Sequence, residues 1–210
     1  MHVAILTSPN QWFEPYAIRL SKRLGGVPVY MDHQAINNPY TVLFILSYHR
    51  IIDQSLLDQN NHNIVIHESD LPTGKGWAPL FWQILEGQNS ITFSMFEALK
   101  GVDAGPIYMQ RTLDLTGYEL NPEIRMKQAE LLIDMCVDFL ENMDQYLPPR
   151  EQIGDETFYP KRTPKDSQLD PQKSLEEQFN LLRIASNEEY PAFFEIGSHR
   201  YLIKIEEKKD

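Results

Sequence analysis

Short apolar runs alternate with segments of helical spacing along the first two thirds of the chain. Apolar and β-branched residues fill runs that predict buried strands at residues 2–6, 27–30, 42–47 and 63–67. Apolar residues recur at three- and four-residue intervals in segments that predict helices at residues 12–24, 54–59 and 79–86. Strands that alternate with helices predict an α/β fold, with a mostly parallel sheet and helices on both faces.

Two further runs extend this pattern before the character of the chain changes. Residues 91–96 and 107–113 predict antiparallel additions to the sheet, joined by a loop that contains glycine and proline. Residues 122–147 predict a long amphipathic helix, because proline suits its first turn and Pro148-Pro149 prevents its continuation.

Beyond residue 148 the chain becomes polar and rich in proline, with no apolar period until its end. This composition predicts an extended segment that crosses the body. Ser174 and Glu177 form a capping-box pattern that predicts a short helix to about residue 185. Residues 192–196 and 201–205 flank a Gly-Ser pair and predict a hairpin. We therefore divide the chain into a main domain, residues 1–150, and a C-terminal extension, residues 151–210.

The charge balance limits the class of partner that the chain can bind. The 210 residues include 30 acidic and 19 basic side chains, which gives a net charge of −11. No stripe of lysine and arginine is present, and a broad nucleic-acid surface needs one to neutralise phosphates. We therefore expect no nucleic-acid partner.

The single cysteine and the start of the chain indicate the cellular compartment. Cys136 lies in an apolar helical pattern and cannot form an internal disulfide, so a cytoplasmic, reducing environment is expected. The apolar start is too short for a signal peptide and lacks its basic flank. No apolar run approaches membrane length, so no membrane partner is expected.

Candidate chemistry gathers at the ends of two predicted sheet elements. The run Asn-Ile-Val-Ile-His places His67 at the end of a strand, and Asp103 follows in a Gly/Pro-punctuated loop. Acyl transfer needs one group that accepts a proton and another that orients it, which such a pair can supply. No closely spaced set of histidine, cysteine and carboxylate residues suggests a metal site.

The residues around this pair occur in a distinctive order. From residue 67 onward they are His67, Ser69, Leu71-Pro72, Gly76, Pro79, Trp82, Gly87, Thr92 and the Asp-Ala-Gly-Pro-Ile turn at 103–107. Over roughly residues 42–109 the chain resembles the N10-formyltetrahydrofolate-dependent formyltransferases. The resemblance implies a Rossmann-like α/β domain, N10-formyltetrahydrofolate as formyl donor, and formyl transfer to a primary amine. It also implies that His67 stabilises the oxyanion and relays a proton, while Asp103 orients His67 or a proton-carrying water.

The chain departs from the family pattern at one position close to the histidine. The family has an asparagine two residues before the histidine, where this chain has Val65. Asn63 points to the same face of the strand but lies about 13 Å from His67 along it. The sequence therefore does not decide which group polarises the formyl oxygen. The candidates are backbone N–H groups, His67 itself and Ser69.

The resemblance also implies where the formyl donor binds. Family members surround the pterin ring with backbone groups at the position of residues 47–52. The candidate donor-binding residues are Tyr48, Arg50, Ile51, Ile52, Ser69 and Leu71. Arg50 and its neighbour His49 can equally be solvated side chains, and Ser69 can simply shape its loop.

Three other segments are candidates for binding the acceptor. Ser8 and Asn10 lie between a strand and a helix, where free N–H groups attract an anion, although a plain helix start is the alternative. Trp12 can stack on a base or sugar, or can belong to the core. Lys161-Arg162 can meet a diphosphate or can be a solvated pair.

The C-terminal extension suggests the acceptor. Residues 159–164 (Tyr-Pro-Lys-Arg-Thr-Pro) and the helix and hairpin after them resemble the sugar N-formyltransferase branch. We therefore expect a nucleotide-linked amino-deoxy sugar of surface-polysaccharide biosynthesis, in a pathway of the pseudaminic-acid type. A tRNA acceptor is disfavoured by the net charge and by the lack of length for a separate RNA-binding domain.

Other functions remain open on the sequence alone. A glycinamide-ribonucleotide-type formyltransferase fits the size of the chain. A formyltetrahydrofolate hydrolase would use the same site with water as acceptor. Val65 also leaves open a non-catalytic protein that binds folate or a sugar nucleotide. The resemblance leaves a homodimer open as well.

Overall fold

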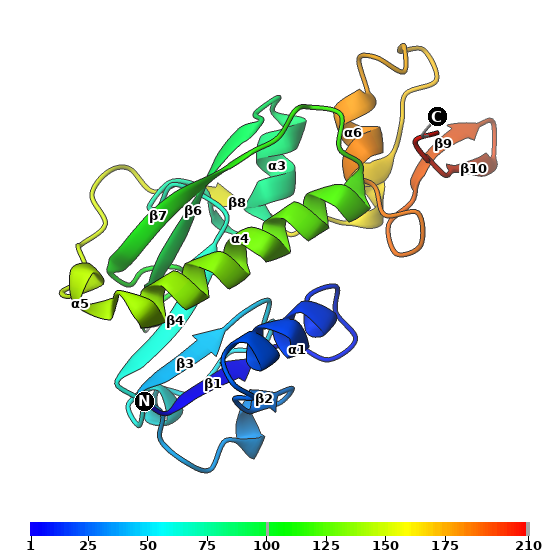
Figure 1. Cartoon of the computed structure of the whole chain (residues 1–210). Coiled ribbons are helices and arrows are strands. Elements are labelled where there is room, and N and C mark those ends of the chain that lie inside the picture. Colours follow the sequence, from blue (N-terminus) through cyan, green and yellow to red (C-terminus); the bar gives the residue numbers. More distant parts are fainter. Residues whose placement is uncertain (100, 209–210) are drawn as a thin grey trace.

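The computed structural model describes residues 1–99 and 101–208 and is built around a six-stranded mixed sheet (Figure 1). The strand order is β2-β1-β3-β4-β6-β7, with parallel pairing from β2 to β4 and antiparallel pairing from β4 to β7. The strands are β1 (Val3–Leu6), β2 (Val29–Tyr30), β3 (Val42–Ile45), β4 (His62–His67), β6 (Ser90–Glu97) and β7 (Ile107–Asp114). The predicted mostly parallel α/β sheet, with two antiparallel additions, is confirmed.

Both faces of the sheet are buried. Alternate side chains of each strand point to opposite faces, so each strand contributes to two cores. Val3 and Ile5 of β1 belong to the larger core, which lies under α1 (Glu14–Arg23), α3 (Pro79–Leu85) and α4 (Asn121–Glu141). Ala4 and Leu6 belong to the smaller core on the other face, which α2 (Gln54–Leu57) covers together with the segment that contains the short 3-10 helix η1 (His33–Ala35).

The helix predicted at residues 122–147 is interrupted. α4 ends at Glu141 because Asn142 leaves the helical conformation, with a φ of −128°, and α5 (Met143–Tyr146) is a separate short helix. The Asn142 side chain donates to the carboxylate of Asp138, a local bond that competes with helix continuation.

The helix predicted from residue 174 is mostly wrong. Ser174 and Glu177 do form the expected reciprocal hydrogen bonds, but they close a turn, and α6 spans only Phe179–Ile184. The Gln178 side chain donates to the carbonyls of Asp170, Lys173 and Ser174, so the chain folds back where a helix would run straight.

The predicted hairpin is present, with β9 (Ala192–Ile196) as expected and β10 (His199–Ile203) starting two residues early.

The C-terminal extension crosses the body, as its composition predicts. Arg150 exchanges backbone hydrogen bonds with Ile107 at the sheet edge. β8 (Phe158–Tyr159) pairs with β5 (Lys75–Gly76), and the 3-10 helix η2 (Pro164–Ser167) follows. The division at residue 150 stays a prediction. Within the described ranges, none of the helices is both long enough and apolar enough to cross a membrane.

Candidate active site

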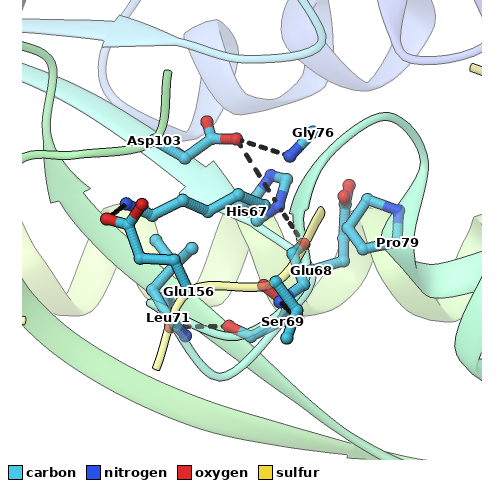
Figure 2. A network of polar contacts seen from close by, with 12 residues as sticks. His67, Glu68, Ser69, Leu71, Gly76, Pro79, Asp103 and Glu156 are labelled. Atoms are coloured by element: carbon cyan, nitrogen blue, oxygen red, sulfur yellow. Dashed lines mark hydrogen bonds and ion pairs between the residues drawn. The ribbon is translucent and has the colours of Figure 1, made fainter. Parts of the chain in front are cut away.

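His67 is the last residue of β4 and is buried at the end of the strand (Figure 2). Its Nε2 atom lies 2.9 Å from the carbonyl oxygen of Gly74 and 3.7 Å from Oδ2 of Asp103. A carbonyl oxygen only accepts hydrogen bonds, so Nε2 carries a hydrogen in this arrangement. The structure therefore brings together the two residues that the motif singles out.

Asp103 is fixed in position by its neighbours on two sides. The backbone N–H of Gly76 donates to the Oδ2 atom that faces His67, at 2.9 Å. The Gln152 side chain donates to the carbonyls of Asp103 and Gly105, both at 2.8 Å. A Cβ atom at position 105 would lie 1.7 Å from the carbonyl oxygen of Glu97, so only glycine lets this loop fold against β6. These contacts therefore hold the carboxylate in a position that faces His67.

The C-terminal extension supports the loop that holds the pair. Gly74 N–H donates to the hydroxyl of Thr157 at 2.8 Å, next to the β5–β8 pairing. The buried ammonium group of Lys75 pairs with Glu156 at 2.5 Å. Sequence reasoning missed residues 156–159 as a part of this site. Two glycines in three residues, Gly74 and Gly76, are the sequence signal of such a close backbone approach.

A chain of polar contacts runs from the residue after His67 to α4. The carbonyl of Glu68 accepts a hydrogen bond from Gln83, and its carboxylate accepts one from Gln128, both at 2.6 Å. Gln128 in turn accepts from the Arg125 guanidinium at 2.9 Å. Gln128 and Arg125 were missed by sequence reasoning, because on an amphipathic helix they read as ordinary polar positions.

Residues with left-handed backbone conformations gather in loops at the strand ends. Among the non-glycine residues described, positive φ values occur at Asn10 (56°), Ser47 (51°), Ala78 (48°) and Asp103 (49°). Such conformations cost energy for residues with a Cβ atom and persist where the surroundings impose them. Asp103, which carries candidate chemistry, is one of them.

Comparison with known proteins identifies the central part of the chain. Residues 31–133 match the family model described as formyl transferase. The central part of the chain is therefore similar to formyl transferases. Members of this family use N10-formyltetrahydrofolate as formyl donor. The matched region includes both His67 and Asp103.

Curated relatives match over only part of their length. The methionyl-tRNA formyltransferase of Rickettsia bellii (strain RML369-C) is 29% identical over 134 residues, which are 63% of this chain and 44% of that protein. That of Rickettsia canadensis (strain McKiel) is 28% identical over the same shares. The match therefore spans less than half the length of these relatives.

Solved structures show the same fold over most of the chain. A methionyl-tRNA formyltransferase from Clostridium thermocellum has a TM-score of 0.81 at 24% identity, covering 95% of this chain and 90% of that one. A 4-N formyltransferase from Francisella tularensis has a TM-score of 0.67 at 15% identity, covering 100% and 99%. HypX from Aquifex aeolicus, in complex with tetrahydrofolic acid, has a TM-score of 0.75 at 17% identity, covering 93% and 36%. At these identities the likeness establishes the formyltransferase fold.

Several donor-binding candidates share one apolar surface. The partly buried side chains of Tyr48, Ile52 and Val65 all pack against the smaller core, and Val65 also packs against a small cluster that contains Leu71. Val65 and His67 point to the same face of β4 because they are two residues apart. The apolar floor formed by Tyr48, Ile52, Val65 and Leu71 therefore lies on the histidine's side of the strand.

The other donor-binding candidates have different surroundings. Arg50 forms an ion pair with Asp32 at 2.6 Å, and Ile51 is 93% exposed. Ser69 is buried, its hydroxyl has no hydrogen-bond partner among the described residues, and it lines a pocket of about 280 Å³ with Tyr159. Arg50 is therefore already paired. The Ser69 hydroxyl is free to form a hydrogen bond, and the Ile51 side chain is free to contact a ligand.

Two of the acceptor-binding candidates, Ser8 and Asn10, already form hydrogen bonds within the chain. The hydroxyl of Ser8 accepts from the backbone N–H of His49 at 3.0 Å, which ties the two loops together. The N–H of Asn10, expected to be free for an anion, donates to the carboxylate of Glu14 at 2.7 Å. The N–H of Asn10 is therefore already paired, and binding of an anion near Ser8 and Asn10 stays a prediction.

Positive charge is available at the other acceptor-binding candidates, Trp12, Lys161 and Arg162. Trp12 is half-buried, with the Arg125 guanidinium 4.3 Å from a ring centroid. The Lys161 ammonium lies 4.8 Å from the centroid of the Trp77 ring. Arg162 donates to the carbonyl of Asp166 at 3.1 Å. No group of three or more histidine, cysteine or carboxylate side chains is arranged for a metal within the described ranges.

Proposed function

We propose that the chain transfers a formyl group from N10-formyltetrahydrofolate to the amine of a nucleotide-linked amino-deoxy sugar. The pathway would be surface-glycan biosynthesis of the pseudaminic-acid type. The observation that carries the transfer reaction is the buried His67–Asp103 pair, with 3.7 Å between Nε2 and Oδ2 at the end of a central strand. Gly76 and Gly74 hold the two side chains in this geometry.

The pair supplies what formyl transfer requires. The lone pair of the amine attacks the formyl carbon, and a tetrahedral oxyanion forms. The bond between this carbon and N10 then breaks, while a proton passes from the amine to N10. We assign the proton relay to His67, and the orientation of His67 or of a bridging water to Asp103.

Oxyanion stabilisation must come from a group other than Val65, because valine has no hydrogen-bond donor. We assign it to an N–H of the His67 ring, with help from backbone N–H groups of residues 68–71. Nε2 lies 3.7 Å from Oδ2 of Asp103, so the carboxylate can orient the ring.

The formyl donor is proposed to place its flat pterin ring on the apolar floor of Tyr48, Ile52, Val65 and Leu71. The backbone of residues 48–52 would read the polar edge of the ring. Exposed Ile51 would cover the ring from outside. A bound folate analogue that contacts neither residues 48–52 nor Leu71 would overturn this placement.

Two features support a nucleotide-linked acceptor. Cationic side chains lie against aromatic rings at two places, Lys161 against Trp77 and Arg125 against Trp12. The 4-N formyltransferase from Francisella tularensis matches this chain end to end, including the extension.

A second candidate is methionyl-tRNA, because the curated relatives described above are methionyl-tRNA formyltransferases. The net charge of −11 weighs against a polynucleotide acceptor, since binding would have to overcome repulsion of its phosphates.

The deciding experiment is a mass-spectrometric screen of the full chain with N10-formyltetrahydrofolate. The acceptor panel contains nucleotide-linked amino sugars, glycinamide ribonucleotide and methionyl-tRNA, and His67→Asn serves as the inactive control. Gain of one formyl group by an amino sugar supports the proposal. Formylation only of methionyl-tRNA or glycinamide ribonucleotide, or release of formate without an acceptor, would replace it. Folate binding without any turnover would identify a non-catalytic binding protein.

A further inference from the structure

Three neighbouring cations form no close ion pair with a carboxylate among the described residues, unlike many of the other basic side chains. They are Arg125 on α4 and Lys161 and Arg162 in the C-terminal extension, here called the cation cluster. The ion pairs found among the described residues involve other basic side chains and none of these three. In a chain of net charge −11, unpaired cations in one place call for a physical explanation.

The Arg125 guanidinium lies against two aromatic rings. Its guanidinium lies 4.3 Å from the ring centroids of both Trp12 and Phe81, and it donates one hydrogen bond, to Gln128. Cation–π contacts cover its faces and leave donor groups at its edge unused. Burial lowers the pKa of Arg125 to about 10, although Glu68 and Glu189 oppose this at longer range. Burying a cation with no carboxylate in direct contact is costly, and an anionic ligand would relieve that cost.

Arg162 also has an unused hydrogen-bond donor, although the charge of the Asp166 carboxylate acts on it. Its Nε atom is buried and has no hydrogen-bond partner among the described residues, and its outer nitrogen donates to the carbonyl of Asp166. Burial lowers the pKa of Arg162. The positive charge of Arg162 in turn helps to lower the pKa of Arg125. The two guanidinium groups are therefore close enough to repel each other, which a shared anion would reverse.

A flat aromatic surface adjoins the cluster. The rings of His49 and Trp77 are nearly parallel, 11° apart with centroids at 6.2 Å, and the Lys161 ammonium lies against Trp77. Burial first, and then the charges of Lys161 and Arg125, lower the pKa of His49, so its ring is held neutral. Trp77 is 43% exposed, which leaves ring surface for a ligand.

The cluster connects directly to the catalytic pair. Trp77 follows Gly76, whose N–H holds Asp103. Arg125 reaches Glu68, the neighbour of His67, through Gln128. A molecule whose anionic part lies on the cluster can therefore present an amine to His67.

We propose that Arg125, Lys161 and Arg162 form a receptor for the diphosphate of the acceptor, with the Trp77–His49 pair stacking on its base. Two guanidinium groups and one ammonium group suit a diphosphate, because arginine binds phosphate oxygens in pairs. The inference rests on the proposed function in one respect, that the diphosphate and the reacting amine belong to one molecule. Phosphate groups also occur in RNA, so the test separates these two sources.

The test measures binding of inorganic pyrophosphate and of uridine diphosphate to the full chain by calorimetry, without formyl donor. Arg125→Met keeps the length of the side chain and removes its charge, and Arg125→Lys restores a charge. Lys161→Met is the second variant, because Lys161 is exposed and makes no hydrogen bond that folding needs. Arg19→Gln is the matched control: Arg19 also lies over an aromatic ring, that of Tyr16, but it is exposed and paired with Glu130.

Each charge removal should weaken binding of both probes by about tenfold, and Arg125→Lys should recover part of the loss. Uridine diphosphate should bind more tightly than pyrophosphate, and Trp77→Leu should abolish that difference. Arg19→Gln should leave both affinities unchanged. Unchanged affinities in Arg125→Met and Lys161→Met, or no pyrophosphate binding to the native chain, would overturn the proposal. A short single-stranded RNA that binds more tightly than the diphosphate would also overturn it.

Failure of the proposed function has a different signature. If pyrophosphate binds as expected but no amino sugar is formylated, the receptor stands and the reaction is wrong. If an amino sugar is formylated but its KM is the same in Lys161→Met and Arg125→Met, the reaction stands and the receptor is wrong.

Discussion

A Cβ atom at position 76 would lie 2.5 Å from the carbonyl oxygen of Tyr159. Gly76 has a φ of +98°, and its N–H is the group that holds Asp103. The C-terminal extension thus packs so closely on the catalytic loop that only glycine fits there. Residues before and after position 150 therefore build one site together.

Gly76→Ala should damage both stability and turnover. The variant combines an unfavourable φ with a backbone clash, so the free energy of unfolding should fall by about 1–3 kcal/mol, and kcat should fall because Asp103 shifts. Gly87→Ala is the matched control, because Gly87 has a φ of +89° but no atom near its Cβ position. Urea unfolding and formyl-transfer rates measure the two effects. Equal behaviour of the two variants would show that the Tyr159 contact has no consequence.

His67→Asn and Asp103→Asn should each lower kcat by about 10²- to 10⁴-fold, the range typical of a lost proton relay. Asp103→Asn keeps an oxygen for the N–H of Gly76, so the loop should keep its geometry. Thermal unfolding and circular dichroism check that the fold is intact, and Asp58→Asn, an exposed change at the C-terminal cap of α2, is the control. Near-normal rates in both site variants would remove the mechanism.

Val65→Asn should change kcat little, because we assign oxyanion stabilisation to His67 and to backbone N–H groups. A single oxyanion donor contributes about 3–4 kcal/mol where it is used. A rate increase of the corresponding size, about 10²-fold or more, would show that the native site lacks a donor that asparagine supplies. Steady-state kinetics of the variant with the identified acceptor decide between these outcomes.

Glu119 should make stability dependent on acid pH. Burial opposes ionisation of this side chain, but hydrogen bonds from Lys127 and from the Thr116 N–H outweigh it and lower its pKa from 4.5 to about 2. Because the folded pKa is the lower one, the stabilisation is fully present above about pH 4.5 and is lost as pH falls towards 2. Its size should be about 3 kcal/mol.

Glu119→Gln should therefore lower the free energy of unfolding at neutral pH and flatten its fall below pH 4.5. Urea titrations between pH 7 and pH 2.5 measure both effects. Glu188→Gln is the control, because Glu188 is exposed and pairs only with Lys204. An unchanged acid dependence in Glu119→Gln would contradict the assignment.

Local pattern and motif were enough to predict the sheet and the catalytic pair. All four residues of β1 are buried, as the apolar run predicts, and their side chains alternate between the two cores because strand side chains alternate by geometry alone. His67 and Asp103 could be named from the sequence because strand ends and Gly/Pro turns place such residues at a sheet edge, and because their neighbours match a known motif.

Only the tertiary structure decided the rest, because those features depend on contacts between distant segments. Gln178 redirects the predicted helix through bonds to carbonyls as far back as Asp170. Arg125 reads as one more solvated position on α4 until Trp12 and Phe81 enclose it. The sequence by itself determined which strands form the sheet and which residues we propose for the chemistry. The close packing of Tyr159 against Gly76, and the gathering of unpaired cations, required the folded chain, because no local pattern records which side chains meet across the body.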